Sequence, residues 1–254
     1  MIDNSLKGGV MEDQIKILQE MIDESKRIVF FGGAGVSTES GIKDFRSVDG
    51  LYNEKYDYFP EEILSHAFFF NKTVEFYKFY YDKLLVEGVE PNPAHFKLAQ
   101  LEKAGKLTSV ITQNIDGLHQ LAGSKKVFEL HGSVERNFCL DCGEFYGQDY
   151  ILNCKKFGVK VPRCRCGGLI KPDVVLYQEG LNDEIVEGAL SAIMSADLLI
   201  VAGTSLTVYP ASGLINYYRG KNLVLINKTP TSADSQASLL IRGKVGEVLS
   251  QIKV

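Results

Sequence analysis

Short hydrophobic runs alternate with amphipathic stretches along most of the chain. Apolar residues recur at helical spacing in Met11–Glu24 and Asn182–Ala196, and an Asn92-Pro93 start with a Gly105 stop frames another helix. Strands rich in Val, Ile and Leu that alternate with helices predict an α/β fold with a parallel sheet covered on both faces. The predicted strands are Ile28–Phe31, Leu107–Thr112, Val127–Leu130, Leu198–Val201, Leu223–Ile226 and Leu239–Ile241.

Two regions break this alternation. Residues 50–88 are rich in aromatic side chains and predict helices, with Val74, Tyr77, Tyr81 and Leu84 on one face. Ordinary helix packing explains these aromatic residues without a ligand. Residues 133–171 contain all five cysteines and indicate a small inserted module.

The composition excludes several classes of protein. Lys and Arg number 28 against 32 Asp and Glu, so the net charge is −4 and neither nucleic acid nor a membrane surface is an expected partner. No apolar run approaches the roughly 18 residues that a membrane span needs, and the first residues lack a signal-peptide pattern. We therefore expect a cytoplasmic protein. Five cysteines, an odd number, argue against a disulfide framework.

Residues 27–46, RIVFFGGAGVSTESGIKDFR, place a glycine-rich segment directly after the first strand. A strand that runs through glycines into a helix presents free N–H groups and a positive dipole end to a phosphate. A tight turn without a ligand is the alternative. Thr38 replaces the third glycine of a dinucleotide fingerprint, and no strand-end acid follows about 20 residues on, which weakens a dehydrogenase interpretation.

Polar and glycine clusters follow directly after five of the predicted strands. In a parallel sheet these points share the edge formed by the carboxyl ends of the strands, where ligands bind. Their convergence predicts an extended ligand such as a dinucleotide. The clusters are residues 32–38, Gln113 to Asp116, His131-Gly132, Gly203 to Ser205, and Asn227-Lys228.

His131 is the candidate acid or base, because it titrates near neutral pH and follows a strand in this set. Asn114 could orient a water or a ribose hydroxyl, and Asp116 could accept a hydrogen bond from an amide or hydroxyl. A turn whose side chains bond to their own backbone is the alternative for both. The remaining histidines, His66, His95 and His119, lie in helical patterns and are interpreted as structural.

The cysteines form two close pairs, Cys139 with Cys142 and Cys164 with Cys166, separated by 21 residues. Four thiolates in two such pairs suit tetrahedral zinc with no open position, which predicts a structural metal. The second pair is closer than usual, Cys154 could substitute as a ligand, and reduced free thiols are the alternative.

These motifs together resemble the sirtuin family of NAD-dependent protein deacylases, in its bacterial form. The resemblance spans nearly the whole chain. It rests on GAGVS (33–37), SGIKDFR (40–46), TQNIDGLH (112–119), ELHG (129–132), the cysteine pairs, KPDVVLY (171–177) and GTSLTVYP (203–210).

The resemblance implies a Rossmann-like domain at 1–44, 91–132 and 172–254, a helical module with a cofactor loop at 45–90, and a zinc module at 133–171. It implies catalytic roles for His131 and Asn114 and zinc ligation by Cys139, Cys142, Cys164 and Cys166. By matching positions, NAD would be bound by Gly33, Ala34, Gly35, Ser37, Thr38, Phe45, Arg46, Gln113, Asn114, Ile115, Asp116, His131, Gly203, Thr204, Ser205, Asn227 and Val245.

The implied reaction transfers the acetyl group of a modified lysine to ADP-ribose. The acetyl oxygen attacks C1′ of the nicotinamide ribose, nicotinamide leaves, and His131 then acts as general base on a ribose hydroxyl. The acetylated protein substrate would add as a strand between Val174–Glu179 and Thr207–Pro210, with Val174, Val175 and Tyr177 as contacts. A monomer is expected.

Several positions depart from the family pattern. Lys43 replaces a usual proline, Gly32 a common threonine, and Gln178 a frequent glycine in the peptide-binding strand. Sirtuins that remove succinyl or malonyl groups carry Tyr-x-x-Arg, whereas residues 77–80 here read Tyr-Lys-Phe-Tyr. We therefore expect a preference for uncharged acyl groups, because an acidic group lacks its bidentate partner. ADP-ribose transfer to a protein and a non-catalytic binding module are the alternative functions.

Overall fold

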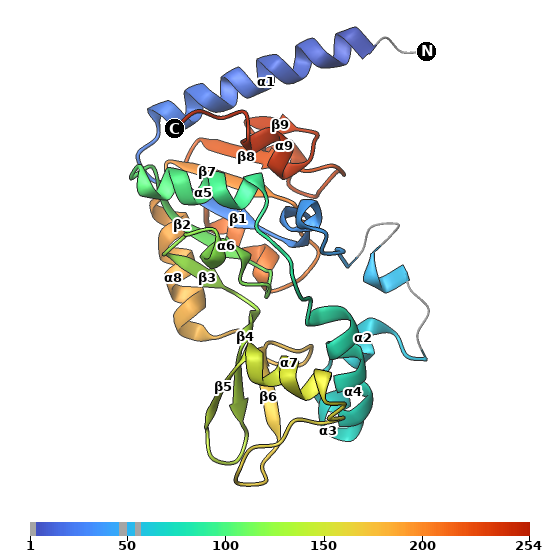
Figure 1. Cartoon of the computed structure of the whole chain (residues 1–254). Coiled ribbons are helices and arrows are strands. Elements are labelled where there is room, and N and C mark those ends of the chain that lie inside the picture. The colour runs from blue at the N-terminus through green and yellow to red at the C-terminus, as the bar shows by residue number, and fades with distance from the viewer. Residues whose placement is uncertain (1–3, 46–49, 54–56) are drawn as a thin grey trace.

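The computed structural model describes residues 4–45, 50–53 and 57–254. A six-stranded sheet in the order β3-β2-β1-β7-β8-β9, parallel throughout, forms the larger part of the molecule (Figure 1). All six predicted strands are present, with ends shifted by at most one residue. They are β1 (Ile28–Gly32), β2 (Leu107–Thr112), β3 (Val127–Glu129), β7 (Leu198–Ala202), β8 (Asn222–Ile226) and β9 (Leu239–Ile241).

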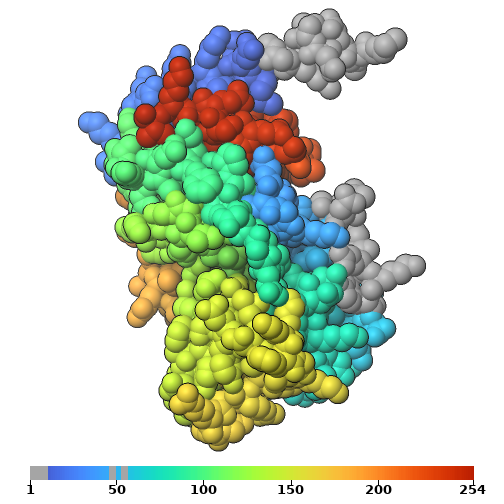
Figure 2. Space-filling model, viewed as in Figure 1, coloured from blue at the N-terminus to red at the C-terminus, as the bar shows by residue number. Residues whose placement is uncertain are grey.

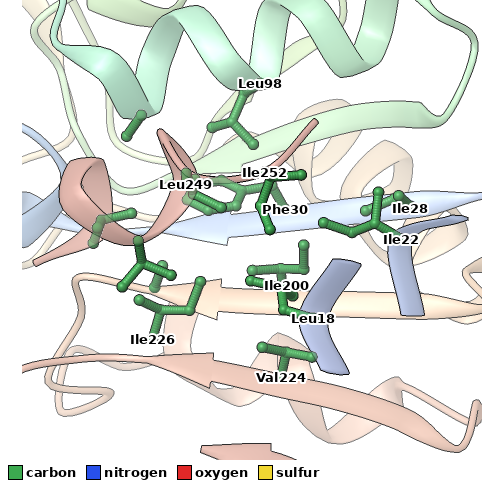
Figure 3. Packing of buried hydrophobic residues seen from close by; sticks show 14 of the residues in the cluster. Leu18, Ile22, Ile28, Phe30, Leu98, Ile200, Val224, Ile226, Leu249 and Ile252 are labelled. Atoms are coloured by element: carbon green, nitrogen blue, oxygen red, sulfur yellow. The ribbon is translucent and has the colours of Figure 1, made fainter. Parts of the chain in front are cut away.

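Helices cover both faces of this sheet, because a parallel sheet with apolar side chains on both faces must be covered on each. On one face lie α1 (Asn4–Glu24), α5 (Pro93–Lys103) and α9 (Val245–Leu249), whose apolar residues pack on Phe30 and Ile200 (Figure 3). On the other face lie α8 (Asp183–Ser195) and the 3-10 helix Ala211–Tyr217, packed on Phe31. The three predicted helices, two from periodicity and one from its start and stop residues, are thus confirmed. The short α6 (Leu118–Leu121) packs beside α5.

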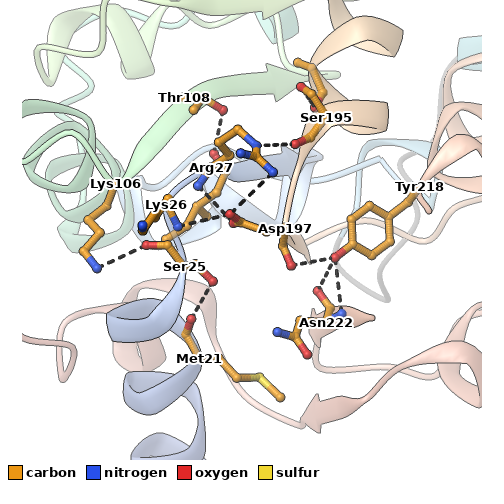
Figure 4. Close-up of polar contacts among 12 residues, drawn as sticks. Met21, Ser25, Lys26, Arg27, Lys106, Thr108, Ser195, Asp197, Tyr218 and Asn222 are labelled. Atoms are coloured by element: carbon orange, nitrogen blue, oxygen red, sulfur yellow. Dashed lines mark hydrogen bonds and ion pairs between the residues drawn. The ribbon is translucent and has the colours of Figure 1, made fainter. Parts of the chain in front are cut away.

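Polar contacts close the amino edge of the sheet, away from the carboxyl ends of the strands (Figure 4). The carboxylate of Asp197 accepts hydrogen bonds from the backbone N–H groups of Lys26 and Arg27 at 3.2 and 2.9 Å. Tyr218 donates to the Asp197 carbonyl oxygen at 3.0 Å. This edge is therefore occupied by the protein's own side chains, which leaves the opposite edge for a ligand.

The aromatic region forms a group of short helices: Leu51–Asn53 (3-10), α2 (Pro60–Ile63), α3 (His66–Asn71), α4 (Thr73–Phe79) and a π turn, Tyr80–Leu84. The expected common face is wrong for Val74, whose side chain is 47% exposed, although Tyr77 is fully buried. The buried aromatic residues are Phe76, Tyr77, Phe79 and Tyr80, which lie three and four positions apart and form one side of the helical turns, so Val74 falls on the opposite side.

The cysteine region forms a three-stranded antiparallel sheet in the order β5-β4-β6, with helix α7 (Gln148–Lys156) against it. Its strands are β4 (Gly132–Cys139), β5 (Phe145–Gly147) and β6 (Ile170–Val174). The region shares one hydrophobic core with the aromatic helices, in which Ile170 and Val134 pack with Phe69 and Tyr77. Figure 2 shows the two segments in contact at the lower end of the molecule.

Within the described part of the chain, no helix combines the length and apolar character that crossing a membrane would require.

Candidate functional site

The glycine-rich segment after β1 forms two 3-10 turns, Ala34–Val36 and Thr38–Ser40, and not the predicted α-helix. Its amides are largely engaged inside the protein: Gly33 N–H donates to Ala202 O at 3.2 Å, and Gly35 N–H to Gly203 O at 2.8 Å. The expectation of an α-helix start with its dipole is therefore wrong, whereas the binding of a phosphate by this segment stays a prediction.

The glycines are needed because two loops touch. A Cβ atom on Gly35 would lie 2.8 Å from Gly203 Cα, and one on Gly33 would lie 2.8 Å from Thr204 Cβ. Gly203 also has φ +59°, in the left-handed region that favours glycine. The predicted clusters after β1 and β7 are thus in close backbone contact at the carboxyl edge of the sheet.

Amide side chains from two further strand ends, those of β2 and β8, meet residues after β7 at the same place. Gln113, after β2, donates through Nε2 to Thr204 Oγ1 at 3.0 Å. Asn227, after β8, donates through Nδ2 to the Thr204 carbonyl at 3.0 Å. Ser205 Oγ lies 2.8 Å from Thr207 Oγ1. The structure therefore brings together the predicted residues after β1, β2, β7 and β8.

A second polar network lies between the segment after β1 and the segment after β2. Ser37 Oγ donates to Asp116 Oδ2 at 2.6 Å, and Asn114 Nδ2 donates to Ser37 Oγ at 3.0 Å. Asp116 Oδ1 accepts from Leu118 N–H at 3.0 Å, and burial raises the pKa of this carboxyl. Asn114 is thus held by its NH₂ group, which leaves its carbonyl oxygen as the acceptor for a ligand.

His131 follows β3 and lies at the junction of the two sheets. Its Nδ1 is 2.9 Å from the Gln113 carbonyl oxygen. A carbonyl only accepts hydrogen bonds, so Nδ1 carries the proton and neutral His131 keeps a lone pair on Nε2. Burial lowers the pKa of the imidazole, against the smaller opposite effect of the Gln113 hydrogen bond. The side chain is therefore neutral at pH 7 and suited to accept a proton at Nε2.

The chain turns sharply beside His131 because Gly132 has φ +75°. A Cβ atom there would lie 1.8 Å from the Asp173 carbonyl oxygen of β6. The Val175 N–H donates to the His131 carbonyl at 3.0 Å. The segment that contains Val174 and Val175, predicted to bind the peptide, therefore passes directly beside the candidate base.

The same segment is tied to the aromatic helices. Tyr177 N–H donates to Leu64 O, and His66 N–H donates to Tyr177 O, both at 2.9 Å. The Leu176 N–H donates to the Glu179 carboxylate at 2.9 Å. Several main-chain groups of the predicted peptide strand are therefore already occupied, which limits where an incoming strand can pair.

Sequence patterns did not identify Glu179 as a central residue of this segment. Its carboxylate also bonds to His66 Nδ1 at 2.9 Å and Lys171 Nζ at 3.0 Å. These partners come from a helix and a strand far apart in sequence, so no local periodicity could indicate the contact. His66 lies at the start of α3, whereas His95 and His119 are buried and in contact with each other.

The remaining predicted cofactor residues lie around these networks. The ring of Phe45 packs edge-on to Tyr52, with 5.6 Å between ring centroids. Ile115 packs against the aromatic core, and its carbonyl accepts from Val134 N–H at 3.0 Å. Val245 is buried at the start of α9. Arg46 lies outside the described residues.

The four paired cysteines form one cluster. The Sγ atoms of Cys139, Cys142, Cys164 and Cys166 all lie within 4.8 Å of one another. Four sulfur donors at this spacing fit a tetrahedral zinc ion with no open position. Tyr146 OH donates to Cys164 Sγ at 3.2 Å, and Gly168 N–H lies 3.4 Å from Cys166 Sγ, which would orient two of the ligands. Cys154 belongs to α7 and is not part of this cluster.

Comparison with known proteins places this arrangement in a family. The Sir2 family model matches residues 33–210. The chain is 58% identical to an NAD-dependent protein deacetylase of Clostridium perfringens, over 95% of this chain and 99% of that one. It is 41% identical to one of Staphylococcus aureus, over 95% and 99%.

Solved structures agree with these relatives. A structure described as "Structural Basis for the Mechanism and Regulation of Sir2 Enzymes" has a TM-score of 0.86 and 43% identity, covering 94% of this chain and 96% of that one. Another, "Sir2-p53 peptide-NAD+", has a TM-score of 0.82 and 38% identity, covering 92% and 95%. Sequence and fold thus agree, and the chain belongs to the Sir2 family.

Proposed function

We propose that this protein is an NAD-dependent protein-lysine deacetylase that transfers the acetyl group to ADP-ribose and releases nicotinamide. The observation that carries the proposal is His131, neutral and with Nε2 left to accept a proton, beside the segment of Val174 and Val175. Relatives named NAD-dependent protein deacetylases at 58% and 53% identity support it.

NAD fits the carboxyl edge of the sheet because amide and hydroxyl side chains from four strand ends converge there. Gln113, Thr204 and Asn227 would hold the dinucleotide, with Val245 at its adenine end. Asn114 and Asp116 would lie at the nicotinamide ribose. When bound, NAD supplies the ribose carbon that loses nicotinamide and the hydroxyl that receives the acetyl group.

His131 accepts a proton from a ribose hydroxyl at Nε2. The hydrogen bond from Nδ1–H to the Gln113 carbonyl strengthens as the ring becomes positive, so it stabilises the charge that develops. Ser37 fixes the amide of Asn114, whose oxygen then orients a hydroxyl or a water. Holding these groups in place before reaction supplies a large part of the lowering of the barrier.

The substrate is an acetylated lysine in an extended segment of another protein. Acetyl and other uncharged acyl groups are preferred, because Tyr80 occupies the position where an acidic acyl group would need arginine. Its ring is fully buried against Phe76, and no hydrogen-bond partner is found for its hydroxyl in the described structure. Faster removal of succinyl than of acetyl from matched peptides would contradict this preference.

The proposed zinc ion is structural. The proposed division into a Rossmann-like domain, a helical module and a zinc module uses the boundaries predicted from the sequence. A cytoplasmic location and a monomeric state complete the proposal.

The test is mass spectrometry of an acetyl-lysine peptide incubated with the protein, with and without NAD. Loss of the acetyl group only with NAD, together with O-acetyl-ADP-ribose, is the expected result. The variant His131→Ala should bind NAD and lose turnover. A peptide or protein that gains ADP-ribose and keeps its acetyl group would show the alternative transferase activity.

A further inference from the structure

The segment after β1 contacts the last helix of the chain through one carboxylate. Glu39, in the turn Thr38–Ser40, accepts a hydrogen bond at Oε2 from the Gly246 N–H at 2.6 Å. Gly246 is the second residue of α9, and 207 positions separate the partners in sequence. A short hydrogen bond between a carboxylate and an amide is of the stronger, charge-assisted kind.

The absence of a side chain at residue 246 makes this contact possible. A Cβ atom there would lie 2.9 Å from both carboxylate oxygens of Glu39. The carboxylate therefore occupies the space that any other residue would fill. The same hydrogen bond gives a partner to the Gly246 amide, which is one of the first amides of α9 and has none inside the helix.

One lysine lies near both carboxylates of this region. Lys244 precedes α9, pairs with Glu247 and is close enough to Glu39 for mutual attraction. Glu247 is 60% exposed and pairs with Lys244 at the start of its own helix, whereas Glu39 joins two elements.

The segment after β1 is held from a second side by α5. Asn92 caps that helix and donates through Nδ2 to the Val36 carbonyl at 2.7 Å and to Ser40 Oγ at 3.0 Å. Helix α9 in turn packs on α5 through Val245 and Leu249, in the cluster that contains Leu98 (Figure 3). Glu39 therefore completes a closed set of contacts among the β1 segment, α5 and α9.

We propose that Glu39 is a positioning residue for NAD: it fixes α9, which carries Val245, against the segment that carries Ala34 and Thr38. This inference rests on the proposed function for the roles of those three residues. The two ends of the dinucleotide site are then set at a fixed separation before the ligand arrives. Pre-organisation of this kind improves affinity because the ligand no longer has to order the protein.

The test measures binding of ADP-ribose and NAD by calorimetry, which does not depend on turnover. Glu39→Ala is expected to weaken both by about fivefold to tenfold, as for loss of a helix cap. Glu39→Gln keeps an acceptor oxygen and should recover most of the affinity. Gly246→Ala, which displaces the carboxylate from the other partner, should match Glu39→Ala. The control Glu247→Ala should stay within about twofold, since exposed ion pairs contribute little.

Steady-state kinetics separates positioning from general damage. Glu39→Ala should raise KM for NAD while kcat at saturating NAD and KM for the acetylated peptide stay unchanged. If Glu39→Ala does not fold, the NAD affinities of Glu39→Gln and Gly246→Ala test the positioning role instead. Wild-type affinity in Glu39→Ala and Gly246→Ala, or equal losses for NAD and peptide, would overturn the inference alone. A wild-type protein that bound neither ADP-ribose nor NAD would overturn the proposed function with it.

Discussion

The hydroxyl groups of Tyr52 and Tyr177 lie 2.8 Å apart, which joins the segment beside the glycine-rich turns to the segment beside His131. Tyr52 also contacts Phe45 through its ring. A change at the predicted cofactor loop can therefore reach the predicted peptide strand through one hydrogen bond.

We expect Tyr52→Phe to raise KM for both NAD and peptide by up to about fivefold, the effect of one hydrogen bond. The double variant Tyr52→Phe with Tyr177→Phe should be no worse than either single variant, because both remove the same bond. Steady-state kinetics on the four proteins checks this. Additive losses in the double variant would show that the two hydroxyls act separately.

The acid limb of kcat/KM should have its midpoint below pH 6.5, the ordinary value for histidine. Burial lowers the pKa of His131, and the reaction needs its neutral form. The rate is therefore full at pH 7 and falls only as the pH drops through the lowered pKa. His131→Asn should reduce kcat by about a hundredfold or more. The pH dependence of kcat/KM for the wild-type protein tests this, and a midpoint of the acid limb above pH 6.5 would be inconsistent with this role.

Replacing Gly132 with Ala should destabilise the protein severely, by about 3 kcal/mol or more. The added methyl group would overlap the Asp173 carbonyl oxygen, 1.8 Å from the Cβ position. Gly105→Ala is the matched control, because Gly105 has φ +74° and no atom within 4 Å of its Cβ position. It should cost only about 1 kcal/mol, the penalty for the left-handed backbone. Urea unfolding measures the free energy of unfolding of both variants. Equal losses of stability would show that the positive φ, and not the overlap with Asp173, causes the effect.

Cys139→Ser should lose bound zinc and lower the melting temperature, whereas Cys154→Ser should keep zinc. Only the former sulfur belongs to the four-sulfur cluster. Metal analysis of the purified variants and of the wild-type protein checks the prediction. A wild-type protein without zinc, or zinc loss in Cys154→Ser, would contradict the proposed ligand set.

Two buried histidines should make the fold sensitive to acid. Burial lowers the pKa of His95 to about 4 and of His119 to about 3, and their rings are 4.7 Å apart. The unfolded chain takes up these protons below about pH 6.5, whereas the folded chain does not. Stability is therefore full above pH 6.5 and is lost as the pH falls towards 4, by about 3 kcal/mol for His95 alone.

His119→Leu should flatten this dependence. Both ring nitrogens of His119 are buried without a partner in the described structure, so the change removes a titrating group without breaking a hydrogen bond. Urea unfolding between pH 7.5 and 4.5 measures the slope. An unchanged slope in the variant would indicate that other groups cause the acid sensitivity.

Local patterns were sufficient for the main sheet. The central strands β1 and β7 are apolar runs buried on both faces, and the polar residues after the strands converge because parallel strands end at one edge. The segment after β1 forms two 3-10 turns and not the expected α-helix, and glycines after a strand do not indicate this difference because they also serve the close contact with Gly203. The Glu39–Gly246 and Glu179–His66 contacts could not be predicted, since they join residues 207 and 113 positions apart.

The two insertions cannot be treated as exchangeable parts. The aromatic helices and the cysteine module complete each other's hydrophobic core, and Tyr77 OH donates to the Ile170 carbonyl across the boundary. Deleting either insertion, or replacing it with that of a relative, would expose the apolar side of the other. A chimaera of this protein would therefore have to exchange both segments together, although β2, β3 and helix α5 lie between them in sequence.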